Sequence, residues 1–206
     1  MILFILSNLL FVNNAFANRS ILLLGDSVSA SYGMQQNQGW VHILNERLKA
    51  SKAGYQIKNA SISGETTGGG LSRLEGILGK EKVDHLLIEL GGNDGLRGYS
   101  PKLIKNNLLQ MIDIAKKQNI PVTVIKIKIT PNYGPRYTKM LENVFDSVSK
   151  EKDVPLIPFF MEEIAKQPEL MMEDGIHPNV EAQPLIADFV GKQLKEMMTL
   201  RQAQGE

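Results

Sequence analysis

Short, continuous apolar runs recur along the chain and predict buried strands of a parallel sheet. A strand that is covered on both faces has no polar side, so it is apolar throughout instead of alternating. The runs lie at residues 21–24, 86–90, 122–127 and 155–158, with a weaker candidate at 56–60.

Apolar residues at helical spacing lie between these runs and predict amphipathic helices. The clearest pattern covers residues 103–115, directly after Pro101, and another covers 185–197. Residues 40–48 and 137–148 are further helix candidates. Because strands alternate with helices, the pattern predicts an α/β fold, a three-layer α/β/α sandwich around a mostly parallel central sheet.

Composition narrows the class of protein. The 206 residues are 43% hydrophobic and 22% charged, which is typical of one domain with a sizeable core. A net charge of +1 and the lack of basic runs argue against nucleic acid as a partner. The sequence contains no cysteine, which excludes disulfides, thiolate metal sites and a cysteine nucleophile.

The first 17 residues predict export. They contain no charged residue, open with an apolar run and end in Ala15-Phe16-Ala17, a signal-peptidase cleavage pattern. The segment is too short to span a membrane, and its alternative is a buried N-terminal strand or helix. We expect residues 1–17 to be a signal peptide and 18–206 a single domain, in the periplasm or secreted.

Small polar residues and glycines follow the predicted strands. Ligands of parallel α/β sheets bind outside the carboxyl ends of the strands, so these residues mark a candidate site. They are Gly25-Asp26-Ser27, Ser61-Ile62-Ser63-Gly64, Gly91-Gly92-Asn93-Asp94, residues 130–134 and, before the last helix, Asp174-Gly175-Ile176-His177-Pro178.

Ser27, His177 and Asp174 are the residues that nucleophilic catalysis requires. A serine hydroxyl needs a base within hydrogen-bond reach, and that base needs a carboxylate to hold its tautomer. Asp174 and His177 are spaced to lie around one tight loop. The other histidines, His42 in a predicted helix and His85 at the start of a strand, are interpreted as packing or surface residues. Taken alone, Gly25-Asp26-Ser27 is typical of a turn in which Ser or Asp caps a helix.

Donors for a developing oxyanion are also present. Asn93 offers its side-chain amide, while Gly64 and Ser27 offer backbone N–H groups. Taken singly, Gly64 and Asn93 are equally typical of ordinary turns.

Together these blocks resemble the four motifs of the GDSL/SGNH hydrolases, which carry Ser, Gly, Asn and His in this order. The resemblance covers nearly the whole chain after residue 17. It implies a flavodoxin-like SGNH hydrolase fold, Ser27, Asp174 and His177 as a catalytic triad, and Gly64 and Asn93 as oxyanion residues. The segments 89–98 and 154–161 resemble a bacterial subgroup with arylesterase, acyl-CoA thioesterase and lysophospholipase activity.

The implied enzyme acts on a small-molecule acyl ester, thioester or lysophospholipid through an acyl-enzyme. It needs no cofactor or metal, does not insert stably into a membrane, and is expected to be a monomer. A carbohydrate O-acetylesterase of the same family is an alternative. A non-catalytic lipid-binding protein on this fold is another alternative, but it would be expected to lack Ser27 or His177, and this chain has both. A nucleotide-binding domain is the last alternative, but no G-x-G-x-x-G motif opens a helix in this sequence.

Other residues near these blocks carry weaker expectations. Asp26 is expected to stabilise the turn, and Glu89 to be hydrogen-bonded near the site. Residues 67–70 are expected to form a glycine-rich loop beside Gly64. A groove for the acyl chain is expected on the loops 95–99 and 130–137, although ordinary loop packing is the alternative. Its candidate lining residues are Leu96, Tyr99, Pro131, Tyr133 and Tyr137.

Overall fold

A five-stranded parallel sheet forms the centre of the molecule. The computed structural model describes residues 19–203. The strands are β1 (Arg19–Gly25), β2 (Tyr55–Asn59), β3 (His85–Glu89), β4 (Val122–Ile125) and β5 (Leu156–Ile157). They are hydrogen-bonded in the order β2-β1-β3-β4-β5, with every pair parallel. This is the flavodoxin-like order, so the predicted sheet is confirmed.

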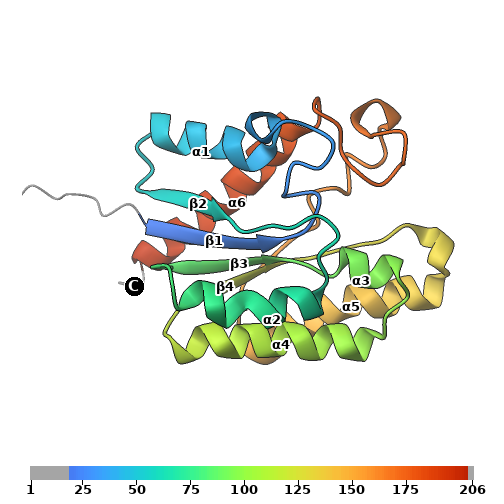
Figure 1. Cartoon of the computed structure of the whole chain (residues 1–206), viewed down its shortest axis with the longest axis horizontal. Coiled ribbons are helices and arrows are strands. Elements are labelled where there is room, and N and C mark those ends of the chain that lie inside the picture. The colour runs from blue at the N-terminus through green and yellow to red at the C-terminus, as the bar shows by residue number, and fades with distance from the viewer. Residues whose placement is uncertain (1–18, 204–206) are drawn as a thin grey trace, which may run out of the picture.

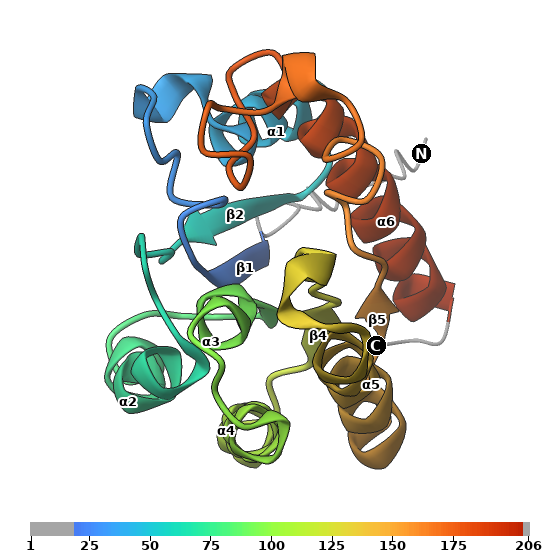
Figure 2. The same cartoon turned by 90° about the vertical axis from the view of Figure 1, so that its right-hand side faces the viewer.

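Helices cover both faces of the sheet (Figures 1 and 2). They are α1 (Trp40–Ala50), α2 (Thr67–Leu78), α3 (Gly92–Leu96), α4 (Pro101–Lys117), α5 (Pro135–Lys152) and α6 (Gln183–Ala203). Short 3₁₀ turns lie at Gln36–Gln38, Pro131–Tyr133 and Pro168–Leu170. Helices α1 and α6 pack on one face, and α2, α4 and α5 on the other, which gives the three layers that the sequence predicts.

Alternate residues of each strand face opposite layers, because successive side chains of a strand point to opposite sides. In β1, Leu22 and Leu24 pack in the core beneath α2 and α4, whereas Ile21 and Leu23 pack toward α1 and α6. Every residue of β3 is buried. Burial on both faces is why these strands appear in the sequence as continuous apolar runs.

Residues 67–70 were expected to form a loop, but they belong to the helix α2. Thr67 through Gly70 form its first turn, and the preceding Thr66 accepts a hydrogen bond from the Gly69 N–H at 3.2 Å. A Cβ at Gly70 would lie 2.4 Å from the side chain of Leu90, so glycine lets this helix approach the sheet closely. The glycines that suggested a loop therefore serve helix packing.

Two further boundaries differ from expectation. The helix α3 occupies Gly92–Leu96, which includes the start of the expected loop 95–99. Strand β4 ends at Ile125, although Ile127 beyond it is still buried. Within the described part of the chain, no helix has the length and apolar character needed to cross a membrane. The expected signal peptide at 1–17 lies outside the described residues.

Candidate active site

Ser27 lies two residues beyond the carboxyl end of β1, in a buried turn. The turn is tightened by the carbonyl of Asp26, which accepts the Ala30 N–H at 2.9 Å, and by Asp26 Oδ1, which accepts the Val28 N–H at 3.1 Å. Asp26 therefore stabilises the turn, as expected. Gly25 is required beside it, because a Cβ there would lie 2.7 Å from both Glu89 Oε2 and Ser61 Oγ.

The loop before α6 brings His177 to Ser27. His177 Nε2 lies 2.9 Å from Ser27 Oγ, and His177 Nδ1 lies 2.6 Å from Asp174 Oδ2. The loop is closed by the Met172 N–H, which donates to the His177 carbonyl at 2.8 Å, and Gly175 takes a φ of +65° at its tip. These contacts join the three side chains into one continuous line of hydrogen bonds.

Asp174 is held in its ionised form. Partial burial raises the pKa of this carboxyl, but the backbone N–H and ring of His177 and the N–H of Ile176 outweigh burial and lower the pKa to about 2. Both N–H groups donate to Oδ1 at 2.9 Å, which leaves Oδ2 for the imidazole. A carboxylate that accepts several hydrogen bonds remains charged at neutral pH, so it can stabilise an imidazolium.

Tyr32 lies against the imidazole and was missed by sequence reasoning. Its ring centroid is 4.4 Å from that of His177, with the ring planes tilted by 35°. Its backbone N–H donates to the Ser27 carbonyl at 3.2 Å, and the preceding Ser31 takes a φ of +60°. Nothing in the local sequence marks Tyr32, because the contact joins segments far apart in the chain.

Asn93 lies in α3 beside the nucleophile turn. Its Nδ2 donates to Asp26 Oδ2 at 3.3 Å. Gly64 lies in the loop between β2 and α2, at a φ of +78°, and its carbonyl accepts a hydrogen bond from Arg97 Nη2 at 3.1 Å. Both predicted oxyanion residues thus lie at the same edge of the sheet as Ser27, Gly64 on a loop and Asn93 in the first turn of α3.

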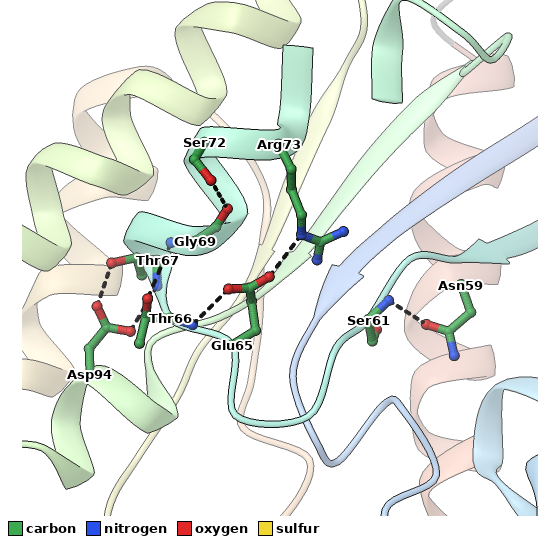
Figure 3. A network of polar contacts seen from close by, with 9 residues as sticks. All are labelled: Asn59, Ser61, Glu65, Thr66, Thr67, Gly69, Ser72, Arg73 and Asp94. Carbon is green, nitrogen blue, oxygen red and sulfur yellow. Dashed lines mark hydrogen bonds and ion pairs between the residues drawn. The ribbon is translucent and has the colours of Figure 1, made fainter. Parts of the chain in front are cut away.

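A buried polar network ties the loop that carries Gly64 to the helix that carries Asn93 (Figure 3). Asp94 Oδ2 accepts the Thr67 N–H at 2.8 Å, and Asp94 Oδ1 accepts the Thr67 hydroxyl at 2.5 Å. Asn107 adds a hydrogen bond to the same hydroxyl at 2.9 Å. On the other side of Thr66, Glu65 forms an ion pair with Arg73 at 2.8 Å. The loop after Gly64 is therefore anchored by α2, α3 and α4.

Glu89 forms a second buried carboxyl beneath the site. Its Oε2 accepts the Asp26 N–H at 3.2 Å and the Ser29 hydroxyl at 2.8 Å, as expected for a hydrogen-bonded residue near the site. Burial and the neighbouring Asp26 charge hold the pKa of Glu89 well above its usual range. Burial also raises the pKa of Asp26, to about 6.

A cavity of about 390 Å³ opens beside Ser27, Asn93 and His177. Most of its lining is apolar. The apolar lining residues are Val28, Leu96, Ile127, Ile129, Phe159, Phe160, Met161, Ala165, Met171 and Ile176. Two larger hollows, of about 910 and 960 Å³, lie around Arg19 and Asp84 at the opposite edge of the sheet, away from these polar groups.

The residues that line this cavity differ from those expected for the acyl groove. Of its candidate residues, Leu96 lines the cavity, but Tyr99, Tyr133 and Tyr137 do not. The hydroxyls of Tyr133 and Tyr137 instead donate to the carbonyls of Leu96 and Tyr99, at 2.9 and 2.6 Å. Pro131 begins a 3₁₀ turn on the same loop.

Residues 159–161 were not predicted to line the cavity, although their position in the sequence suggests it. They follow a predicted strand end, as the polar blocks do. Reading that strand end as part of the site would have predicted an apolar wall, since the carboxyl ends of parallel strands meet at one edge of the sheet.

The remaining histidines lie away from the cavity. His42 is exposed on α1, and the His85 ring contacts the Thr123 hydroxyl at 2.9 Å in the core. Among residues 19–203, no group of three or more His, Cys, Asp or Glu side chains is arranged to hold a metal ion.

Comparisons with known proteins agree with one another. Residues 23–184 match the model of the GDSL-like lipase/acylhydrolase family. An arylesterase of Vibrio mimicus is 44% identical over 178 residues, which cover 86% of this chain and 89% of that protein. Thioesterase 1/protease 1/lysophospholipase L1 of Escherichia coli K12 is 42% identical over 184 residues, which cover 89% of this chain and 87% of that protein.

A solved structure is similar in fold and sequence. The psychrotrophic esterase EstA of Pseudoalteromonas sp., inhibited by monoethylphosphonate, superposes with a TM-score of 0.87. It is 43% identical, and the match covers 88% of this chain and 100% of that one.

Proposed function

The chain belongs to the GDSL-like lipase/acylhydrolase family, and on this premise we propose that it hydrolyses acyl esters and thioesters with Ser27 as nucleophile. The observation that carries the proposal is the continuous hydrogen-bonded line from Ser27 through His177 to Asp174. It supplies a nucleophile, a base and a carboxylate that orients the base, which is the set of groups that acyl transfer requires.

The reaction proceeds through an acyl-enzyme. His177 Nε2 takes the proton of the Ser27 hydroxyl as Oγ attacks the acyl carbon, and then returns that proton to the leaving alcohol or thiol. A water molecule repeats the sequence on the acyl-enzyme and releases the acid. Asp174 remains charged throughout and balances the imidazolium.

Three donors stabilise the developing oxyanion in this proposal. They are the backbone N–H groups of Ser27 and Gly64 and the side-chain amide of Asn93. A preorganised donor of this kind is worth about 10² to 10³ in kcat, because it needs no reorganisation when the charge develops. The anchored loop at Gly64 and the hydrogen bonds of Asn93 and Asp94 in α3 support such preorganisation.

The cavity beside Ser27 supports an apolar acyl group as the preferred substrate portion. Its volume of about 390 Å³ and its lining by Ile127, Ile129 and residues 159–161 suit an alkyl chain longer than acetyl. The names of the relatives, an arylesterase and a thioesterase/lysophospholipase, are consistent with broad leaving-group tolerance.

We propose further that the protein is exported as a monomer to the periplasm, with residues 1–17 removed and 18–206 forming one domain. The Ala15-Phe16-Ala17 pattern supports cleavage after Ala17. N-terminal sequencing of protein from its own cells should begin at Asn18, and an intact Met1 on cytoplasmic protein would contradict export.

A serine-directed phosphonate tests the nucleophile. We expect mass spectrometry to find the label on Ser27 and none on Ser29, Ser61 or Ser63, which lie nearby in the fold or motif. Ser27→Ala should prevent labelling, whereas Ser72→Ala, a change at an exposed serine of α2, should not. A label elsewhere, or one retained by Ser27→Ala, would contradict the assignment.

A panel of p-nitrophenyl esters from acetate to decanoate tests the acyl cavity. We expect kcat/KM to rise with chain length beyond acetate and Ala165→Trp, on the cavity wall, to reduce it selectively for long esters. A preference for acetate that Ala165→Trp leaves unchanged would instead favour the O-acetylesterase alternative.

A further inference from the structure

The carboxylate of Asp26 joins two parts of the site. Its Oδ1 accepts the Val28 N–H at 3.1 Å, within the nucleophile turn, while its Oδ2 accepts Nδ2 of Asn93 at 3.3 Å, from α3. The side chain is buried, with 4% of its surface exposed. A Cβ at Gly92 would lie 3.2 Å from Asp26 Oδ2, so a glycine before Asn93 leaves room for the carboxylate beneath the α3 turn.

We propose that Asp26 is a positioning residue that fixes which end of the Asn93 amide faces the reacting oxygen, and that protonation of Asp26 releases this orientation. The inference rests on the proposed function, since it concerns the oxyanion donor of the same reaction. It assigns Asp26 a second role that the turn does not require.

The two ends of the Asn93 amide differ in hydrogen-bonding chemistry. An asparagine side chain carries an acceptor oxygen at one end and an NH₂ group with two donors at the other. Turned one way, Asn93 stabilises a developing oxyanion, and turned the other way its own oxygen repels that charge. The two orientations have nearly the same shape, so packing alone does not distinguish them.

An ionised Asp26 does distinguish them. A carboxylate only accepts hydrogen bonds, so it selects the orientation in which Nδ2 faces Asp26. One N–H of that group is then directed to Asp26. The second N–H remains available in the cavity that Asn93 shares with Ser27 and His177. The contact that satisfies the buried carboxylate therefore also keeps the amide oxygen out of the oxyanion position.

Protonation removes this selection. A neutral Asp26 carries an O–H that can donate to the oxygen of Asn93, so both amide orientations become acceptable. Three titratable groups from other elements interact electrostatically with Asp26. They are His177 from the loop before α6, Glu89 from β3 and Asp94 from α3.

The charge of Asp26 changes within the range in which enzymes are assayed. Burial is the largest influence and raises the pKa, and Asp94 also raises it. The Val28 N–H, the charge of His177 and the Asn93 amide act in the opposite direction, and the resulting pKa of Asp26 is about 6. Asn93 is therefore oriented at neutral pH and released in mild acid.

A double-mutant cycle tests the proposal. Asp26→Asn offers one acceptor oxygen and one NH₂ group in place of two acceptor oxygens. With its oxygen on the Val28 N–H, its NH₂ group faces Asn93 and favours the reversed orientation of the Asn93 amide. We expect kcat to fall about 10- to 100-fold, bounded by the 10² to 10³ expected for losing the donor itself, while KM changes little. Because both changes remove the same function, Asp26→Asn/Asn93→Ala should be no more than about twofold slower than Asn93→Ala alone. Multiplicative losses would overturn the proposal.

A pH profile provides a test that does not depend on the folding of Asp26→Asn. For wild-type protein, log kcat/KM should fall more steeply below about pH 6 than for Asn93→Ala, because protonation of Asp26 releases Asn93 only where Asn93 is present. Asn93→Ala leaves Asp26 in place but removes the amide that Asp26 orients, so protonation of Asp26 should add no further loss in that variant. Equal slopes for the two proteins would overturn the proposal.

Controls separate this inference from the proposed function. Asp188→Asn makes the same chemical change on the exposed face of α6, where Asp188 pairs with Arg47, and should leave both kcat and the pH profile unchanged. An active wild-type enzyme with a multiplicative cycle overturns the inference alone. A wild-type protein without activity on any ester overturns the proposed function as well.

Discussion

The two carboxyls of the site, Asp26 and Asp174, are held in opposite ways. Asp174 lies on an exposed loop and has a pKa lowered to about 2 by hydrogen bonds from His177 and Ile176, which outweigh its partial burial. Asp26 follows the end of β1 in a buried turn, where burial raises its pKa to about 6 despite hydrogen bonds of its own. Depth in the fold decides which influence prevails.

The range of their contacts differs as well. Every hydrogen bond that holds Asp174 comes from within three residues, so the base loop is a local structure. Asp26 contacts Glu89 and Asn93, which are 63 and 67 residues away. The proposed base is therefore oriented by local chain geometry, and the proposed oxyanion donor by tertiary packing.

The largest loss of activity is expected when the locally held carboxylate of Asp174 is removed. Asp174→Asn removes the charge that balances the imidazolium and permits the wrong tautomer, so kcat/KM should fall about 10⁴-fold. Steady-state kinetics on a p-nitrophenyl ester measures the loss. The neighbouring exposed Glu173→Gln makes the same charge change and should stay close to wild type; similar losses in both variants would contradict a specific role for Asp174.

Removing the Asn93 amide, which is held by its tertiary contact with Asp26, should reduce activity less. Asn93→Ala removes one of the proposed oxyanion donors, so kcat should fall by about 10² to 10³ while KM stays nearly unchanged. Phosphonate labelling of Ser27 should slow in parallel, since the adduct carries a similar oxygen. Asn106→Ala, at an exposed position of α4, is the matched control. A folded Asn93→Ala enzyme with normal kcat would remove Asn93 from the oxyanion site.

The two carboxyls should also have opposite effects on stability. The pKa of Asp26 rises from 3.8 to about 6 on folding, so the folded state binds its proton more tightly and the free energy of unfolding falls as pH rises from about 4 to 6. A shift of this size corresponds to about 3 kcal/mol. For Asp174 the stabilisation falls as pH drops from about 4 to 2, and solvent screens it.

Urea unfolding at pH 4, 5, 6 and 7 measures the contribution of Asp26 to the free energy of unfolding. Wild type should lose stability relative to Asp26→Asn as pH rises through this range, because the variant has no proton to release at position 26. A constant difference between the two proteins would show that Asp26 does not titrate in this range.

The smallest expected effect concerns Tyr32, which packs on the His177 ring. An aromatic pair contributes about 0.5–1.5 kcal/mol, so Tyr32→Ala should lower kcat/KM about 2- to 10-fold. Tyr32→Phe keeps the ring and should restore activity. An equal loss in both variants would assign the effect to the hydroxyl and not to the packing of the ring.

The features that depend on local patterns were predictable from the amino-acid sequence. Continuous apolar runs predict strands buried on both faces, and polar residues after those runs predict a site at one edge of a parallel sheet. The pairing of Asp174 with His177 was also predictable, because both residues lie within one tight loop. These signals are local, since each depends on residues that are neighbours in the chain.

The remaining features depend on contacts between parts of the chain that are far apart in sequence. The glycine-rich segment 67–70 suggests a loop, but it forms the start of the helix Thr67–Leu78. It does so because Asp94 accepts hydrogen bonds from Thr67, the first residue of the helix, and because Gly70 fits against Leu90. The apolar wall at residues 159–161 and the contact of Asp26 with Asn93 likewise join strands that are distant in sequence. The physical reason is that parallel strands meet only through long crossover connections, so no local pattern records which side chains their ends bring together.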